Sequence, residues 1–418
     1  MVALKKSCNF GDDSMKRILI TIIALCFITT GWSQEIIDID SINVADIITY
    51  QESNAIDDTI AAPVKKEGFF KKMVRYVCGD ENDTIAKPAT TKAKWVILGG
   101  PHYSTDAKFA LMLAGMLSHH LKGRQPTDQP SKIDVWVDIS TAGFWTVGLS
   151  GTTLFPGDRY RLNSELKFNY SPQKFWGIGY DQAIIDANES KIRKQEITFS
   201  GDFNIKVVPH FYTGFATAWN YITGGKIERP ELLEGQNETV MNLGLGYSLY
   251  FDTRDQMTNT TKGFYFAFKQ LFHPKFLLND DIFTTTIFTI SGYHPAWKGA
   301  ILAGELRGTF NVGSPSWAMM AQLGSNSSMR GYYAGRFRDK HSMTAQVELR
   351  QHIWKRSGIV VWGGVGNVFH DSHSFGQLLP NFGIGYRFRL RPNVVLRLDY
   401  GFGRKGQNGF VMAVNEAF

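Results

Sequence analysis

The chain has 418 residues, a formal net charge of +7 and a mean hydropathy of −0.18. Aromatic residues make up 13% of it, with 30 Phe and 10 Trp, which is more than a soluble protein of this length usually carries. Only Cys78 follows the N-terminal apolar run, so we expect no intrachain disulfide in the mature chain. The excess of positive charge fits an anionic membrane surface or an anionic lipid better than a catalytic centre.

The N-terminal part of the chain has the layout of a secretory signal peptide. Two basic residues after Met15 precede an apolar run over residues 18–28, and small residues stand before a cleavage point after Ser33. The pattern predicts a signal peptide over residues 1–33, with Met15 as the functional start. A transmembrane anchor is the alternative, but the apolar run is shorter than the ~20 residues that a spanning helix needs.

Residues 34–94 have no repeated pattern and are interpreted as a periplasmic N-terminal spacer. The segment is too short and irregular for an independent enzymatic domain. It contains one short amphipathic piece, Glu67–Tyr76. This piece is either a helix that lies on a membrane surface or part of a linker.

From residue 95 to the end of the chain, apolar and polar residues alternate with a period of two. Met241, Leu243 and Leu245, for example, are separated by polar or small residues. Such alternation places one face of a strand in an apolar medium and the other face in a polar one. The pattern predicts sixteen strands, each close to the ~9–11 residues of a tilted membrane strand. They span 95–103, 107–120, 132–142, 144–155, 159–171, 193–206, 209–222, 238–252, 262–273, 282–294, 299–312, 343–354, 358–369, 380–390, 394–404 and 409–418.

The connections between these strands alternate between short and long. Phe155–Asp158 and Ala296–Lys298 are short, whereas residues 172–192 and 313–342 are long. Short turns on one side and long loops on the other, with an even number of strands, are typical of outer-membrane barrels. We therefore predict an all-β fold, a 16-stranded antiparallel transmembrane β-barrel over residues 95–418, in the bacterial outer membrane. A soluble β-sandwich is the alternative, and the signal peptide and the loop lengths favour the barrel.

The first and last strands would meet at the seam of such a barrel. The first strand contains Gly99, Gly100 and Pro101, and proline cannot donate to a strand ladder. We expect the seam to be short of hydrogen bonds near Pro101, unless the proline simply ends the strand at a turn. The last strand carries Phe410 and Phe418, and its terminal aromatic residue resembles the C-terminal signal of outer-membrane barrels.

The loop between the eleventh and twelfth strands is basic and aromatic. Its stretch Ser328–Lys340 contains three arginines, a lysine and several aromatic residues. A long loop inside a compact domain is usually functional or disordered, and this composition is not that of a disordered segment. We predict that the loop folds into the lumen of the barrel.

The loop contains Arg330-Gly331-Tyr332, and the turn after the eighth strand contains Asp252, Arg254 and Asp255. These two motifs resemble the inward-loop motif and the periplasmic turn motif of the BamA/TamA superfamily, the insertases and translocases of the outer membrane. The resemblance covers residues 95–418 and implies an inward-folded loop and a part in inserting or translocating proteins or lipids. The superfamily usually carries periplasmic POTRA modules, and residues 34–94 lack their pattern, so the resemblance is to a branch without them.

An arginine inside a lumen needs a carboxylate or several carbonyls to offset its desolvation. The superfamily often has an aspartate on the thirteenth strand for this purpose, where this chain has Gly364. By parity, Glu348 and Asp399 face the lumen from the twelfth and fifteenth strands. We predict that Arg330 pairs with Asp399, Glu348 or both, with Gly331 allowing a close backbone approach, so that the loop forms an internal latch. The alternative is that Arg330 is a solvated loop residue.

No motif predicts an enzyme. The glycine-rich run 401–406 lacks a surrounding βαβ unit, and His370 and His373 lie in an exposed loop without further spaced ligands. We expect no catalytic residue, cofactor, metal or nucleic acid. The expected partners are outer-membrane lipid and lipopolysaccharide, with client proteins or separate periplasmic factors. A passive or selective pore, or a structural surface antigen of the same fold, is the functional alternative to insertion or translocation.

Overall fold

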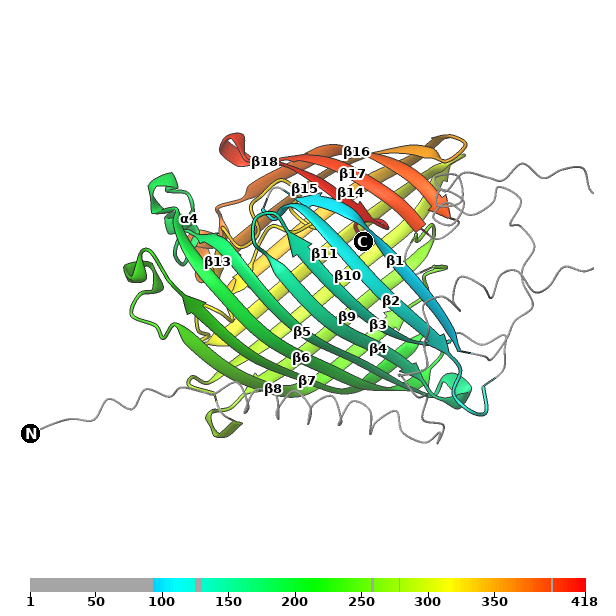
Figure 1. Cartoon of the computed structure of the whole chain (residues 1–418), viewed down its shortest axis with the longest axis horizontal. Helices are drawn as coiled ribbons and strands as arrows, with labels where there is room; N and C mark the ends of the chain where they lie inside the picture. The colour runs from blue at the N-terminus through cyan, green and yellow to red at the C-terminus, as the bar shows by residue number, and fades with distance from the viewer. Residues whose placement is uncertain (1–92, 105, 125–129, 257–258, 278, 392–393) are drawn as a thin grey trace, which may run out of the picture. The chain divides into compact units, whose positions relative to one another are not determined.

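The computed structural model describes residues 93–418, apart from residues 105, 125–129, 257–258, 278 and 392–393 (Figure 1). The predicted signal peptide and nearly all of the spacer lie outside the described residues. Within the described part, no helix is both long and apolar enough to cross a membrane.

Sixteen antiparallel strands form a closed barrel in which each strand pairs with its neighbours in the chain and β1 pairs with β18 (Figure 1). The predicted fold class is therefore confirmed. The strands are β1 Lys94–Ser104, β2 Lys108–His119, β3 Ser131–Ser140, β4 Trp145–Leu154, β5 Tyr160–Phe175, β6 Ser190–Val208, β7 Phe211–Gly225, β8 Thr239–Asp252, β9 Gly263–His273, β10 Phe283–Trp297, β11 Ala300–Gly313, β14 His341–Trp354, β15 Ser357–Phe369, β16 Leu379–Arg391, β17 Val394–Phe402 and β18 Asn408–Val414.

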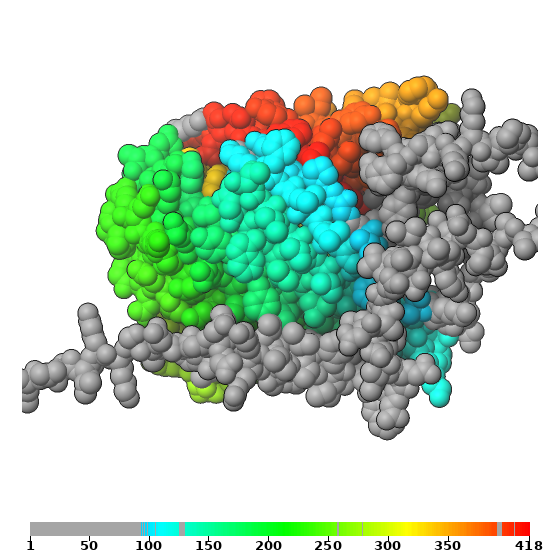
Figure 2. Space-filling view, in the orientation of Figure 1, coloured from blue at the N-terminus to red at the C-terminus, as the bar shows by residue number. Residues whose placement is uncertain are grey.

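The two faces of the barrel wall differ in exposure, as the alternating sequence requires. On β14, Val347 is 53% exposed, whereas its neighbour Glu348 is fully buried. On β16, Phe382 and Ile384 are exposed and Arg387 is buried. Because successive side chains of a strand point to opposite faces, the apolar set faces outward and the polar set faces the lumen. The segments coloured blue to green form a continuous wall where they are in view (Figure 2).

The connections at the two ends of the barrel differ in length. Residues 209–210, 298–299 and 355–356 are turns at one end. At the other end, residues 314–340 connect β11 to β14 and contain two short paired strands, β12 Ala321–Gln322 and β13 Arg338–Asp339. We call residues 314–340 the long loop. The short helices α4 Tyr180–Ala183 and α5 Ser372–Phe375 lie in other connections at the same end.

The last strand is shorter than the sequence pattern predicts. The expected strand over residues 409–418 ends at Val414, and Asn415 has a positive φ of 68°. The chain then turns toward the polar face, where Arg350 donates to the main-chain oxygen of Phe418 over 2.9 Å. Phe418 therefore does not continue the outward row that begins at Phe410.

Candidate functional site

The predicted latch residue Arg330 lies fully buried against the lumenal face of the C-terminal strands. Its guanidinium donates to Asp399 of β17 over 2.8 Å and to Glu348 of β14 over 2.7 Å. Both carboxylates are themselves fully buried. The structure thus brings together the three charged residues that the sequence singled out, and a planar guanidinium suits two acceptors on different strands.

Three further side chains surround Arg330, and sequence reasoning missed all of them. The side-chain oxygen of Gln346 on β14 accepts from the guanidinium of Arg330 over 3.5 Å. The guanidinium carbon lies 3.6 Å from the ring centroid of Trp362 on β15. Asn381 on β16 donates to the main-chain oxygen of Arg330 and accepts from the indole nitrogen of Trp362. Arg330 and its direct partners therefore involve all four strands from β14 to β17.

The main chain of the loop approaches β17 very closely at Gly331. A Cβ on Gly401 would lie 2.1 Å from the main-chain oxygen of Arg330. Gly331 has a φ of +104°, and a Cβ on it would lie 2.5 Å from the main-chain oxygen of Gly401. Only glycine combines that backbone conformation with that approach at low cost. Next to it, the hydroxyl of Tyr332 donates to the main-chain oxygen of Pro380 over 2.6 Å, and the main-chain nitrogen of Arg404 donates to that hydroxyl.

The carboxylates that hold Arg330 also bind other arginines. Arg350 contacts Glu348 over 2.7 Å, and Arg397 contacts Asp399 over 3.1 Å. Arg387 bridges Asp399, over 2.5 Å, and Glu416, over 2.7 Å. This group of four arginines and three carboxylates is here called the lumenal ion cluster. It comprises Arg330, Arg350, Arg387, Arg397, Glu348, Asp399 and Glu416.

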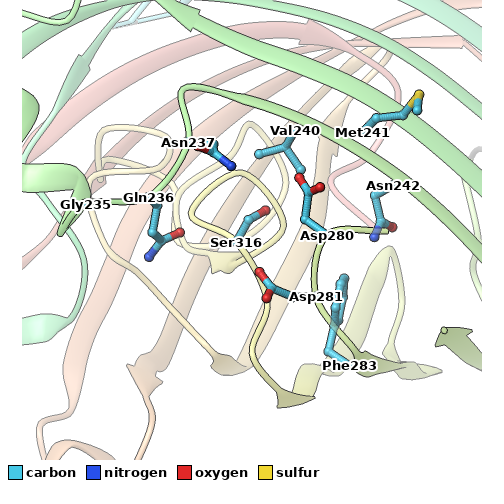
Figure 3. Close-up of a pocket in the computed structure, with 10 residues that line it drawn as sticks. All are labelled: Gly235, Gln236, Asn237, Val240, Met241, Asn242, Asp280, Asp281, Phe283 and Ser316. Carbon is cyan, nitrogen blue, oxygen red and sulfur yellow. The ribbon is translucent and has the colours of Figure 1, made fainter. Parts of the chain in front are cut away.

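The beginning of the long loop has its own anchor at Trp317. This side chain is fully buried in a cluster with Phe175, Ile192 and Val240. Its indole nitrogen donates to the main-chain oxygen of Asn237 over 3.0 Å. A cavity of about 160 Å³ lies beside it, lined by the first residues of β8 and β10, by the connections before these strands and by the neighbouring Ser316 (Figure 3).

The later part of the long loop contacts the other loops at the same end. The main-chain nitrogen of Ala334 donates to Asp106 over 3.1 Å, and burial raises the pKa of Asp106 to about 6. His370 lies 2.8 Å from the carboxylate of Asp339, and this hydrogen bond raises the pKa of the imidazole. Arg338 is fully buried, and burial lowers the pKa of its guanidinium to about 10.

The predicted turn motif forms a local hydrogen-bonded unit between β8 and β9. Asp252 accepts two hydrogen bonds from the guanidinium of Arg254, over 3.0 and 2.8 Å. Asp255 accepts from the hydroxyl and main-chain nitrogen of Thr261. Burial opposes ionisation of Asp255, but these hydrogen bonds keep its pKa below the ordinary value. The guanidinium of Arg254 also lies 4.0 Å from the ring centroid of Tyr265.

The seam is the shortest ladder of the barrel within the described residues. Its register joins Tyr103 to Met412 and Ser104 to Val411, whereas β1 and β2 are paired along their whole length. Pro101 lies two residues before the first of these positions, and Gly99 and Gly100 precede it. The main chain of β1 therefore meets β18 only at the loop end of the strand, as far as the described residues show.

In the described part of the chain, no group of three or more His, Cys, Asp or Glu side chains is arranged to hold a metal ion. Asp371, between the two histidines that the sequence raised as a metal site, caps α5 by accepting from the main-chain nitrogen of Ser374.

A closed sixteen-stranded barrel with an apolar outer face and a buried polar interior is the architecture of bacterial outer-membrane proteins. The Omp85 superfamily domain matches residues 131–415, so the chain belongs to the Omp85 superfamily. This confirms the resemblance to BamA and its relatives. A search of the curated proteins finds no match.

Solved structures share the fold at low sequence identity. BamA from Haemophilus ducreyi lacking POTRA domains 1–3 has a TM-score of 0.56 and 12% identity, over 78% of this chain and 70% of that one. CdiB from Acinetobacter baumannii has a TM-score of 0.52 and 11% identity, over 78% and 60%. CdiB from Escherichia coli has a TM-score of 0.51 and 9% identity, over 79% and 64%. The chain thus spans less than two thirds of either CdiB.

Proposed function

We propose that the chain acts in the bacterial outer membrane, where it assists the insertion or translocation of proteins or lipids and performs no enzymatic reaction. The observation that carries the proposal is the seam, which joins β1 to β18 at two register positions among the described residues. Each antiparallel register position contributes little to the stability of a strand pair. A ladder with two positions therefore opens far more readily than the longer ladders of the barrel. Opening there would give a substrate access to the bilayer from the lumen.

The long loop supports this proposal as an internal latch. Arg330, Gly331 and Tyr332 hold it against β14 to β17, which precede the seam strand β18 in the barrel. A loop fixed in this way narrows the lumen and keeps the C-terminal strands together while β1 separates from β18. Client proteins or separate periplasmic factors would supply the substrate.

A disulfide across the seam tests the proposal. Tyr103→Cys and Met412→Cys, in a Cys78→Ser background, place two thiols at partner positions. We expect the oxidised variant to change outer-membrane protein or lipid composition as depletion of the protein does, and a reductant to restore it. The matched control is Leu113→Cys with Val137→Cys, which are partners on β2 and β3. Normal composition with the oxidised seam variant would contradict the proposal.

Conductance in planar bilayers separates this function from a passive or selective pore. A barrel whose loop occupies the lumen is expected to show small, brief openings. A steady, large conductance in the unaltered protein would favour the pore instead.

A further inference from the structure

A cavity of about 600 Å³ lies at the loop end of the barrel, between β5, β6, the β1–β2 turn and the long loop. Its volume is in the range of pockets that hold a small ligand or a lipid headgroup. It is separate from the lumenal ion cluster, with which it shares no residue. Five cationic side chains line it: Lys108, Lys174, Lys191, Arg193 and Lys226.

The charge around this cavity is only partly neutralised. Lys191 pairs with Glu228 over 3.6 Å, and Lys174 pairs with Glu189 over 2.6 Å. Among the residues that the structure describes, Lys108, Arg193 and Lys226 have no carboxylate within ion-pair distance. Asp106 and Glu228 are the carboxylates of the lining, and Glu189 pairs with Lys174 from outside it, which leaves an excess of two positive charges around the cavity.

Neutral hydrogen-bond donors add to this excess of charge. The side-chain nitrogen of Gln173, which lines the cavity, is buried and has no acceptor in the described part of the chain. The hydroxyl of Tyr333 accepts from the main-chain nitrogen of Lys174 over 3.0 Å, so its own hydrogen remains free for a ligand. Cations together with unused donors are what a phosphate group requires.

The position of the cavity along the barrel selects the kind of phosphate. On β5, Tyr170 stacks on Trp145 with ring centroids 6.2 Å apart, and Trp145 is exposed on the outer face. Exposed aromatic residues of this kind mark the membrane–water interface of barrels. Lys174 is on the same face of β5, four residues further toward the loops, which is about 13 Å along the tilted strand. The cavity therefore lies on the loop side of this aromatic pair, where charged side chains can meet the headgroups of the outer leaflet.

We propose that this cavity binds the phosphate of an outer-leaflet lipid headgroup, and that Lys108, Arg193 and Lys226 are its principal contacts. The inference rests on the proposed outer-membrane location, with the loop end facing outward. Because Tyr333 and Asp106 both line the cavity, and Asp106 binds the main chain at Ala334, a bound headgroup touches the long loop itself. Lipid binding would therefore stabilise the position of the long loop.

Native mass spectrometry of the full chain in detergent tests this binding without any insertion or transport reaction. The probe is bisphosphorylated lipid A, compared with the same lipid after removal of its phosphates. We expect one tightly bound phosphorylated lipid per chain and at least tenfold weaker binding of the dephosphorylated one. Equal binding of the two lipids overturns the proposal, and this comparison needs no variant.

A triple variant then locates the site. Lys108→Gln, Arg193→Gln and Lys226→Gln are changes at exposed positions, and folding is checked by the gel shift of the unheated barrel. We expect at least tenfold weaker binding of bisphosphorylated lipid A. The control removes the same charge elsewhere, at the exposed Lys262, Lys275 and Lys298.

Three outcomes overturn the assignment. The triple variant binds as the unaltered chain does, or the control loses as much affinity, or inorganic phosphate at low millimolar concentration fills the site while the lipid does not. A failed seam disulfide experiment leaves this binding result unaffected, because the two measurements share no variant.

Discussion

Replacement of Arg330 by alanine is the sharpest test of the proposed latch. Arg330 makes one charged hydrogen bond to Asp399 and one to Glu348, and such bonds contribute roughly 1.5–3 kcal/mol each. Removing one partner of a buried ion pair usually costs ~3–5 kcal/mol, because the other charge is left uncompensated. In this chain both carboxylates keep an arginine: Arg350 stays with Glu348, and Arg397 stays with Asp399.

The lumenal ion cluster therefore falls from four arginines and three carboxylates to three of each. The barrel side of the contact remains neutralised, and the loss is concentrated on the docking of the loop. We expect loop docking to weaken by about 2–4 kcal/mol, somewhat less than the ~3–5 kcal/mol for a broken buried pair, because both carboxylates stay compensated. Asp399→Asn should destabilise the barrel more, because Arg330, Arg387 and Arg397 all lose a shared negative charge, and the new amide NH2 group faces their donors.

Limited trypsin digestion measures the docking directly, because Arg336 and Lys340 supply cleavage points within the loop. When opening and closing are fast, cleavage follows the population of the open loop. A loss of 2–4 kcal/mol then accelerates cleavage roughly 30- to 700-fold, since each 1.4 kcal/mol is a factor of ten. Arg229→Ala, which removes an arginine from another loop, is the control and should leave the rate unchanged. A rate for Arg330→Ala within twofold of the unaltered chain would refute the latch.

Three further changes test neighbouring contacts of the loop. Gly401→Ala should loosen the loop as Arg330→Ala does, since its Cβ would lie 2.1 Å from the main-chain oxygen of Arg330; trypsin cleavage reports it. The His370–Asp339 contact should stabilise the loop fully below about pH 6.5 and lose that effect as pH rises through the raised pKa of the imidazole. In a pH series of trypsin cleavage rates, His370→Ala should abolish this dependence. Asp106 has a raised pKa of about 6, so the stability of the docked loop should fall as pH rises from about 4 to 6. Hydrogen exchange of the main-chain amides of the loop measures this stability, and Asp106→Asn should show no such fall.

The barrel and the direction of the key side chains could be predicted because both follow from strand parity. A strand with Val347 and Glu348 in succession must send one to lipid and the other to the lumen. The same rule placed Asp399 inside. Parity also places Trp362 inside, between the outward Val361 and Gly363, but it does not say at which position along the strands the loop contacts the inner face of the barrel. The stacking of Arg330 on Trp362 therefore depended on the fold of the long loop, which no repeating pattern determines.

The bend at the C-terminus left a signal in the sequence that strand alternation alone overlooked. Phe410, Met412 and Val414 form an outward row, and Glu416 has the same parity. A straight strand would place that carboxylate in lipid, where a charged side chain is costly. The chain avoids this at Asn415, whose residue type tolerates the observed positive φ, and Glu416 reaches Arg387 in the lumen instead. Pro101 indicated a seam short of hydrogen bonds, but it removes only one donor and so could not predict that the seam has only two register positions among the described residues.

The proposed latch and the seam are joined by a single series of ion pairs. Arg330 binds Asp399, Asp399 binds Arg387, and Arg387 binds Glu416, just beyond the end of β18. Arg387 holds Glu416 in the lumen, so the residues after Val414 do not extend the ladder with β1, and this contact ties the end of β18 to the loop. In a buried cluster of this kind each charge depends on its neighbours for compensation, and a shift at one member changes the balance at the others. We therefore expect a displacement of the loop at Arg330 to reach the end of β18 through Asp399 and Arg387, which would give the loop a physical means of influencing how readily the barrel opens.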